Sequence, residues 1–491
     1  MRRMKGAAGL LTALLLAFQL SAQTFALANE DNGIKVVPVN FTHNGYSYEI
    51  EGVAKSTDGD YQIKSPARLA ARKLPSTYDP RSSGEITTVK DQASTGACWA
   101  FSALACAEQD LIKKGLENPS TEFSVPALVL SSNSGTATGK DDFSSGGNWL
   151  FAASALANGQ GLCYEDYEPF LESGTGNMIV SENKKSVSEY RLNYVMELSS
   201  TTQVKRKIME LGAVSASYFA GNGYMNHNNT AYYDPDASKN TIINHSVTVV
   251  GWDDNYSKDN FRYKPANNGA WLVKGSWGAD QDNDGFYWVS YDEAEFGQFC
   301  CYDFEESCDN TYHYSKMTGY VVNASNDGSV YGANVFTAKA DEKLDKAGFM
   351  YVGKTGSADY TLSVYTDVSD SDPIGVLETQ ISGSVSANGF YTVDFPEDIL
   401  LEEGEKYSIS VKFSGDSGRG YLLAESDRTS KAQSGQSYVS LNGKYWSDVG
   451  ADKTDSIGSL FIYAYTDDTA KPDKSSLGTT LAKYGTLAGC E

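Results

Sequence analysis

The sequence predicts an α+β domain followed by an all-β sandwich. Apolar residues recur at helical spacing early in the chain, where Phe101, Leu104, Ala105, Leu111 and Ile112 share one face of a helix over 98–114. From about residue 309, short runs alternate apolar and polar residues and are separated by Gly, Asp and Ser. The 491-residue length is more than a single core usually supports, which also favours several domains.

Further elements follow in chain order. Helices are expected at 147–158 and 201–211, and the strand signals then dominate. Strands are expected at Val247–Trp252, Ala270–Val273 and Phe286–Tyr291. Helices followed by strands within one segment are typical of an α+β domain.

The alternating region 309–466 is the predicted sandwich. Residues 360–364 and 407–413 alternate strictly, and Ser459–Tyr465 is a third expected strand. Many short strands divided by turn residues favour a β-sandwich. The segment 467–491 is rich in Lys, Ser and Gly and is expected to be a flexible tail.

Composition excludes some partners. The formal net charge is −23, so the long-range field repels nucleic acid and anionic membranes. Apolar residues make up 41% of the chain, which is enough for packed cores, and aromatic residues make up 12%. A globular protein that binds no nucleic acid is therefore expected.

The N-terminus carries a predicted signal peptide at 1–28. A basic start precedes the apolar run AAGLLTALLLAF at 7–18, and Ala26-Leu27-Ala28 offers a cleavage site. A membrane anchor is the alternative, but the run is shorter than the ~20 residues that a spanning helix needs. A secreted, extracellular protein without an integral membrane segment is expected, with 29–73 as a propeptide or N-terminal extension.

Seven cysteines are present, at 98, 106, 163, 300, 301, 308 and 490. The count is odd, so at least one lacks an intrachain disulfide partner. No pair has zinc-ligand spacing, and the sequence predicts no metal site and no cofactor. The spacing alone assigns no disulfide.

Cys98 is the candidate nucleophile. It lies at the expected start of the first helix, where the helix dipole and unpaired N–H groups favour a thiolate. Gln92 lies six residues earlier, so its side-chain amide can reach the backbone N–H of Cys98. Two such donors together can bind the oxyanion of a tetrahedral intermediate.

His245 is the candidate base. The chain has only four histidines, and His245 begins the strand-like run HSVTVVGW. His227 lies in the turn-like NHNNT, His43 lies in the expected propeptide, and His313 lies near the expected domain junction. A Cys–His pair distant in sequence is typical of covalent catalysis by a thiolate.

These motifs resemble the papain family of cysteine peptidases. Residues 92–103 are similar to its nucleophile motif, and the distance of 147 residues from Cys98 to His245 fits the family spacing of ~130–150. Residues 244–245 resemble its histidine strand, and 274–278 followed by Gly285-Phe286 resemble its closing strand pair. LPSTYD at 74–79 is similar to the mature N-terminus of that family.

The resemblance implies a two-lobed papain-like catalytic domain at 74–308. It further implies a substrate cleft lined by Gly146, Gly147, Trp277 and Asn244, with the glycine pair binding the peptide backbone. The region 309–466 resembles the lectin-like sandwich found behind bacterial papain-like domains, so carbohydrate is a candidate ligand there.

Several positions depart from the family pattern. Thr95 and Ser144 stand where the family has two cysteines, so one family disulfide is absent. Gly275 stands at the third triad position, where the family has the asparagine that orients the histidine. Gln281 replaces a tryptophan that shields that hydrogen bond.

The sequence therefore predicts a secreted cysteine endopeptidase acting on polypeptides. In this hypothesis Cys98 forms a thioester acyl-enzyme, with His245 as general base and acid. The alternative is a glycan- or surface-binding adhesin whose papain-like domain is impaired by Gly275, and a transferase using the same acyl-enzyme is a third candidate. Asp280–Asp284 resembles part of a calcium loop, although an acidic solvated turn is the simpler interpretation.

Overall fold

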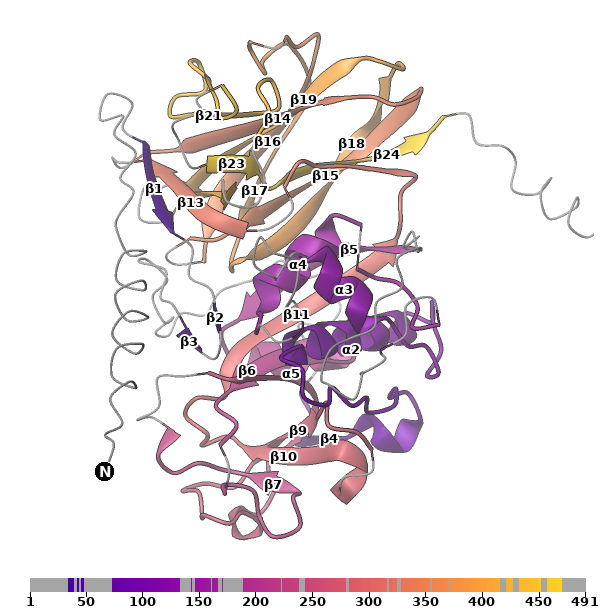
Figure 1. Cartoon of the computed structure of the whole chain (residues 1–491), viewed down its shortest axis with the longest axis vertical. Coiled ribbons are helices and arrows are strands. Elements are labelled where there is room, and N and C mark those ends of the chain that lie inside the picture. The colour runs from indigo at the N-terminus through magenta and orange to yellow at the C-terminus, as the bar shows by residue number, and fades with distance from the viewer. Residues whose placement is uncertain are drawn as a thin grey trace, which may run out of the picture.

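The protein is described by a computed structural model (Figure 1). It describes residues 34–38, 42–43, 46–47, 73–132, 143, 146–159, 161–166, 170, 189–221, 223–237, 243–279, 282–315, 318–324, 328–353, 356–369, 371–415, 421–426, 432–451 and 457–469. The expected signal peptide, residues 470–491 of the expected tail, most of 29–73, Ser144, Asp280, Gln281 and Cys490 lie outside the described residues.

Helix α2 (Cys98–Lys113) forms the centre of the N-terminal region. All of its residues from Cys98 to Leu111 are buried, because α3 (Val125–Ser131), α4 (Trp149–Ala157) and α5 (Thr201–Leu211) surround it together with the sheet. Helix α5 begins with a capping box, in which Ser200 and Gln203 each bind the other's backbone N–H. The helix predicted at 98–114 is confirmed.

The predicted strands of the N-terminal region form one side of a mostly antiparallel sheet. The strands of this part of the sheet lie side by side in the order β5, β11, β6, β8, β9, β10, β7. The bounds are β5 (Tyr190–Leu198), β6 (Val214–Tyr218), β7 (Ala231–Tyr232), β8 (His245–Asp253), β9 (Ala270–Lys274), β10 (Phe286–Ser290) and β11 (Gly297–Glu306). Strand β4 (Thr77–Tyr78) pairs with the end of β8, which places the expected mature N-terminus beside the sheet.

The C-terminal region is a sandwich of two packed layers. One layer has the order β17-β16-β19-β14-β21-β22, and the other contains β12, β24, β15 and β18. Phe349 of β15 packs against Tyr360 and Phe413 of the opposite layer, with ring centroids 5.0 and 5.3 Å apart. The bounds are β12 (Asn310–Tyr312), β14 (Val330–Thr337), β15 (Glu342–Tyr351), β16 (Ala358–Thr366), β17 (Val376–Val385), β18 (Gly389–Leu401), β19 (Lys406–Gly415), β21 (Ser437–Ser440), β22 (Ser447–Asp448) and β24 (Ile462–Asp468).

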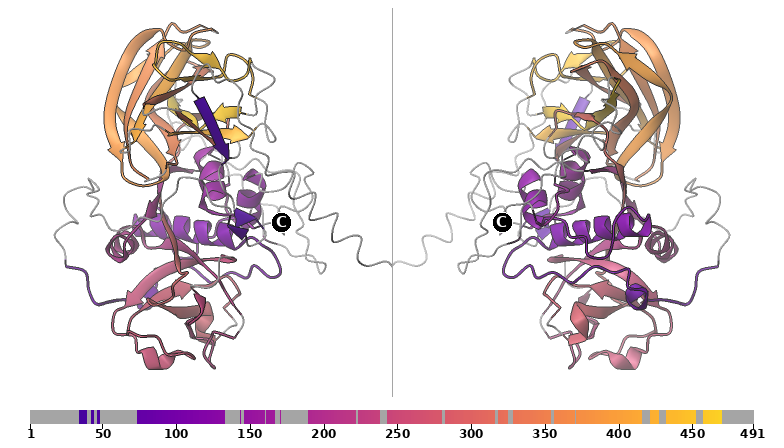
Figure 2. Two further views of the ribbon diagram at one scale, coloured as in Figure 1. Left: turned by 90° about the vertical axis from the view of Figure 1, so that its left-hand side faces the viewer. Right: turned by 90° about the vertical axis from the view of Figure 1, so that its right-hand side faces the viewer.

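The two regions share a sheet. Residues Gly389–Tyr391 of β18 pair with Met196–Tyr194 of β5, so the sandwich layer and the N-terminal sheet form a single twelve-stranded sheet. Figure 2 shows the helices lying between the sandwich above and strands β9 and β10 below. One hydrophobic core runs from α2 into the sandwich. The prediction of an α+β region followed by a mainly β region is confirmed, but the shared sheet was not predicted.

A smaller sheet involves the N-terminal segment. Strand β1 (Ile34–Pro38) pairs antiparallel with β13 (Thr318–Ala324), which is followed in the sheet by β20 (Tyr421–Ser426) and β23 (Ile457–Leu460). A hairpin of β2 (Thr42–His43) and β3 (Tyr46–Ser47) follows β1. No helix among the described residues has the length and apolarity needed to cross a membrane.

Candidate active site

Cys98 is the first residue of α2, as the sequence predicts. Its side chain is nearly buried, with 8% of the residue exposed. Burial raises the pKa of the Cys98 thiol, whereas the backbone N–H groups of Ser246 and Trp99 act in the opposite direction. The thiol therefore faces the residue directly after His245.

His245 is the first residue of β8. One turn after Cys98, Ser102 donates its hydroxyl to the carbonyl of Val247 at 2.7 Å, and this contact fastens α2 to the start of β8. The structure therefore brings the start of α2, which carries Cys98, beside the start of β8, which carries His245. Burial lowers the pKa of His245 to about 3. Burial thus favours a neutral thiol and a neutral imidazole.

Trp277 covers the imidazole. Its ring lies parallel to that of His245 at an angle of 8°, with the centroids 4.3 Å apart. The indole is 40% exposed, so it forms an outer wall of the site and not part of a core. Its role in binding substrate stays a prediction.

His245 lacks a partner on one ring nitrogen. Within the described part of the chain, its buried Nε2 has no hydrogen bond. Gly275 supplies no side chain here, and its backbone N–H donates to Gly285 O at 3.1 Å. A Cβ at position 275 would lie 3.1 Å from that carbonyl oxygen and 3.4 Å from the Tyr287 ring.

Gln92 is held close to the nucleophile loop. Its Oε1 accepts a hydrogen bond from Ser276 Oγ at 2.6 Å, and its Nε2 donates to Thr95 O at 2.8 Å. Thr95 thus closes the loop that leads into α2, at a position where the family has cysteine. The amide nitrogen of Gln92 carries two hydrogens, and Thr95 accepts one of them.

The glycine pair lies against the residue that follows Cys98. A Cβ at position 147 would lie 2.5 Å from the Trp99 ring, so only glycine fits there. Asn148 caps α4 by accepting a hydrogen bond from Leu150 N at 2.9 Å. Gly147 therefore lies between Trp99 of the nucleophile helix and the capped start of α4.

Asn244 binds the backbone of Ala220 through both atoms of its side-chain amide. Its Oδ1 accepts from Ala220 N at 2.7 Å and its Nδ2 donates to Ala220 O at 3.3 Å. These bonds brace the entry into β8, directly before His245. The amide therefore binds the chain's own backbone in this structure.

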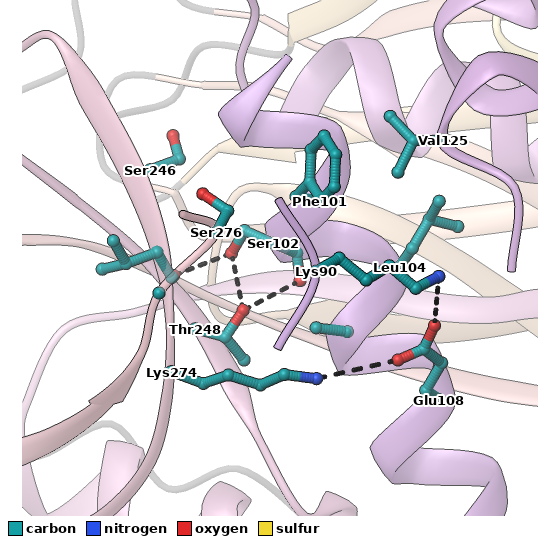
Figure 3. Close-up of a pocket in the computed structure, with 13 residues that line it drawn as sticks. Lys90, Phe101, Ser102, Leu104, Glu108, Val125, Ser246, Thr248, Lys274 and Ser276 are labelled. Atoms are coloured by element: carbon teal, nitrogen blue, oxygen red, sulfur yellow. Dashed lines mark hydrogen bonds and ion pairs between the residues drawn. The ribbon is translucent and has the colours of Figure 1, made fainter. Parts of the chain in front are cut away.

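A buried ion cluster lies behind the site and was missed by the sequence reasoning. Glu108 lies on the inner face of α2, where Lys90 Nζ is 3.1 Å and Lys274 Nζ is 3.9 Å from its carboxylate. Figure 3 shows both ammonium groups converging on Glu108, beside a cavity lined by Gly275, Ser246 and Ser276 among others. Burial alone would raise the pKa of Glu108, but the two lysines outweigh it and hold that pKa below its usual value.

Comparisons with known proteins identify the family. The pattern of "Papain family cysteine protease" matches residues 74–326, more than half of the chain. The chain belongs to the papain family of cysteine proteases. A second pattern, "Lectin like domain", matches residues 311–466.

The relatives of this chain include several cathepsins. Mouse cathepsin K is 24% identical over 216 residues, which cover 44% of this chain and 59% of the cathepsin. Bovine cathepsin S is 29% identical over 218 residues, which cover 44% of this chain and 60% of the cathepsin. The alignment thus spans about three fifths of each of these two relatives.

Two solved structures resemble the whole architecture. The cysteine protease and lectin-like domains of Cwp84, a surface layer associated protein of Clostridium difficile, superpose with a TM-score of 0.72 and 25% identity, covering 89% of this chain and 99% of that one. A Cys-to-Ala variant of clostridial Cwp84 after propeptide cleavage gives a TM-score of 0.69 and 27% identity, covering 80% and 99%. The papain-family domain and the lectin-like sandwich therefore occur together in a known structure.

The described papain-family domain holds no disulfide. Cysteines 98, 106, 163, 300, 301 and 308 form none with one another. No group of three or more His, Cys, Asp or Glu side chains among the residues described is placed to hold a metal ion. In the acidic turn, Asn283 and Asp284 adopt left-handed backbone angles and Asn283 Nδ2 donates to Phe286 O at 2.9 Å, so this amide closes the turn.

Proposed function

We propose that the protein is a cysteine endopeptidase with Cys98 as nucleophile and His245 as base. The observation that carries this proposal is the contact of α2 with the start of β8 in a chain of the papain family. The Cys98 thiol lies at the N-terminus of α2, beside Ser246, which directly follows the buried His245.

The proposed reaction is acyl transfer to Cys98 and then to water. His245 takes the thiol proton as Cys98 Sγ bonds to the peptide carbonyl carbon, and the oxyanion accepts from Cys98 N–H and a Gln92 amide hydrogen. The imidazolium then gives its proton to the leaving amine, and the C–N bond breaks to leave a thioester. His245 next deprotonates water, which attacks the thioester carbon. The C–S bond then breaks, the acid is released, and the imidazolium returns its proton to Cys98 Sγ.

Cys98→Ala tests this assignment. It should abolish peptide hydrolysis and leave the thermal transition in place, because alanine fits the same helix position. Cys106→Ala is the matched control, since Cys106 is buried in the same helix and should not be needed for hydrolysis. Undiminished hydrolysis by Cys98→Ala would refute the proposal.

The same chain supports a binding role for the sandwich. The lectin-like match over 311–466 motivates carbohydrate as a ligand, and the signal-like N-terminus motivates secretion. The alternative of an impaired adhesin rests on Gly275 and the unpartnered His245 Nε2. Glycan-array binding by Cys98→Ala, together with no hydrolysis by the unaltered chain, would favour that alternative.

A further inference from the structure

A hydrogen-bonded junction links the sandwich to the substrate cleft. Glu197 lies in β5, the strand that pairs with β18 of the sandwich. Its Oε1 accepts from Trp149 Nε1 at 3.0 Å, and its Oε2 accepts from Asn388 Nδ2 at 3.1 Å. One carboxylate therefore joins α4 of the peptidase domain to the sandwich.

Asn388 is itself fixed from two further sides. Its Oδ1 accepts from Gly353 N at 2.9 Å, and its backbone carbonyl accepts from Glu197 N at the same distance. The residue is buried, with 4% exposed. With both amide atoms engaged, the orientation of the Asn388 side chain is set by the sandwich.

Trp149 carries this restraint to the cleft. It is the first residue of α4, and Gly146-Gly147-Asn148 lead directly into it. Gly147 in turn lies against Trp99, next to Cys98. The position of the glycine pair relative to the nucleophile thus depends on where the Trp149 indole is held.

We propose that Asn388 and Glu197 are positioning residues that hold the Gly146-Gly147 segment in place for peptide substrates. This role rests on the proposed function, in which the glycine pair binds the substrate backbone. A sandwich side chain then contributes to peptide binding without contacting the peptide. Neither residue takes part in the chemistry at Cys98.

A reciprocal exchange of amide and carboxylate tests the junction. Asn388→Asp alone sets the new carboxylate against that of Glu197. In Glu197→Gln alone, the new amide nitrogen faces either the Asn388 amide nitrogen or Trp149 Nε1, so two donors meet and one hydrogen bond is lost. In the double variant, the new glutamine amide donates to the new aspartate and still accepts from Trp149 Nε1. The second aspartate oxygen accepts from Gly353 N, so every hydrogen bond is restored with one carboxylate in total.

The measurements are KM and kcat on a peptide substrate and the rate at which iodoacetamide alkylates Cys98, all on the full chain. Each single variant should raise KM about tenfold, which corresponds to substrate binding weakened by a factor of ten. The values of kcat and of the alkylation rate should stay within about twofold of those of the unaltered chain. The double variant should return KM to within about twofold.

Three results would overturn the inference. KM could be unchanged in both single variants, or it could stay raised in a folded double variant. Alternatively, kcat and the alkylation rate could fall while KM rises, which would indicate a general loss of structure. Absence of hydrolysis by the unaltered chain is a separate result that overturns the proposed function and the positioning role with it.

Discussion

Gly275→Asn should make the enzyme faster. His245 Nε2 is buried without a partner in the described structure, and an unsatisfied buried polar group costs about 1–3 kcal/mol. A Cβ at 275 lies only 3.1 Å from Gly285 O, a backbone atom that already accepts from Gly275 N, so part of the gain is lost to a local shift. We expect a net gain of about 1.4 kcal/mol in transition-state stabilisation, which corresponds to a tenfold rise in kcat/KM.

The pH dependence gives a second readout for this variant. An acceptor on Nε2 stabilises the imidazolium and raises the pKa of His245, and the retained positive charge lowers the pKa of Cys98. Because the free protein favours a neutral imidazole, the acid limb of the kcat/KM profile reports protonation of His245 and should move to higher pH.

Gly275→Ala is the matched control for the same experiment. It adds the Cβ and its contacts with Gly285 and Tyr287 but no acceptor. We expect its kcat/KM to equal or fall below that of the unaltered chain. If the asparagine and alanine variants have the same kcat/KM and the same acid limb, another group already orients His245 and the reasoning is wrong.

Three further predictions concern stability and processing. Glu108→Gln leaves Lys274 without its buried counter-charge and should cost about 3–5 kcal/mol in urea unfolding, whereas Asp259→Asn at an exposed pair should not move the midpoint. Because the lysines hold the pKa of Glu108 below 4.5, the difference in unfolding free energy between Glu108→Gln and the unaltered chain should shrink as the pH falls below that value. A difference that stays constant with pH would contradict this. A chain of 74–308 lacks β18 and should melt well below the chain ending at 469; equal melting temperatures would show that β5 does not depend on β18. Mass spectrometry should show that the active form begins at Leu74 with 29–73 still bound through β1 until denaturation, and an active form beginning at Asn29 would refute this.

Local patterns in the sequence predicted much of the peptidase domain. The face of α2, the alternation in β16 and β19, and the run that becomes β8 all depend on neighbouring residues, so periodicity finds them. The pairing of β5 with β18 depends on residues about 195 positions apart, which no local pattern encodes.

The candidate site was predictable to a similar extent. Cys98 and His245 were selected by motif and spacing, and the structure brings their elements together. Glu108 was missed, although a carboxylate on the buried face of a predicted helix is itself a signal that cations lie opposite. The contact of Asn244 with Ala220 could not be read from the sequence, because it depends on how β6 ends beside β8.

The pairing of β18 with β5 also limits how such a chain could have been assembled. A Cβ at position 389 would lie 2.0 Å from the carbonyl oxygen of Val195, so the strand approaches its neighbour closely enough to require glycine. A sandwich moved behind an unrelated peptidase would present an unpaired strand edge, which is a site of aggregation. Exchange of this sandwich between proteins by recombination should therefore succeed only when the donor and recipient strands are inherited as a matched pair.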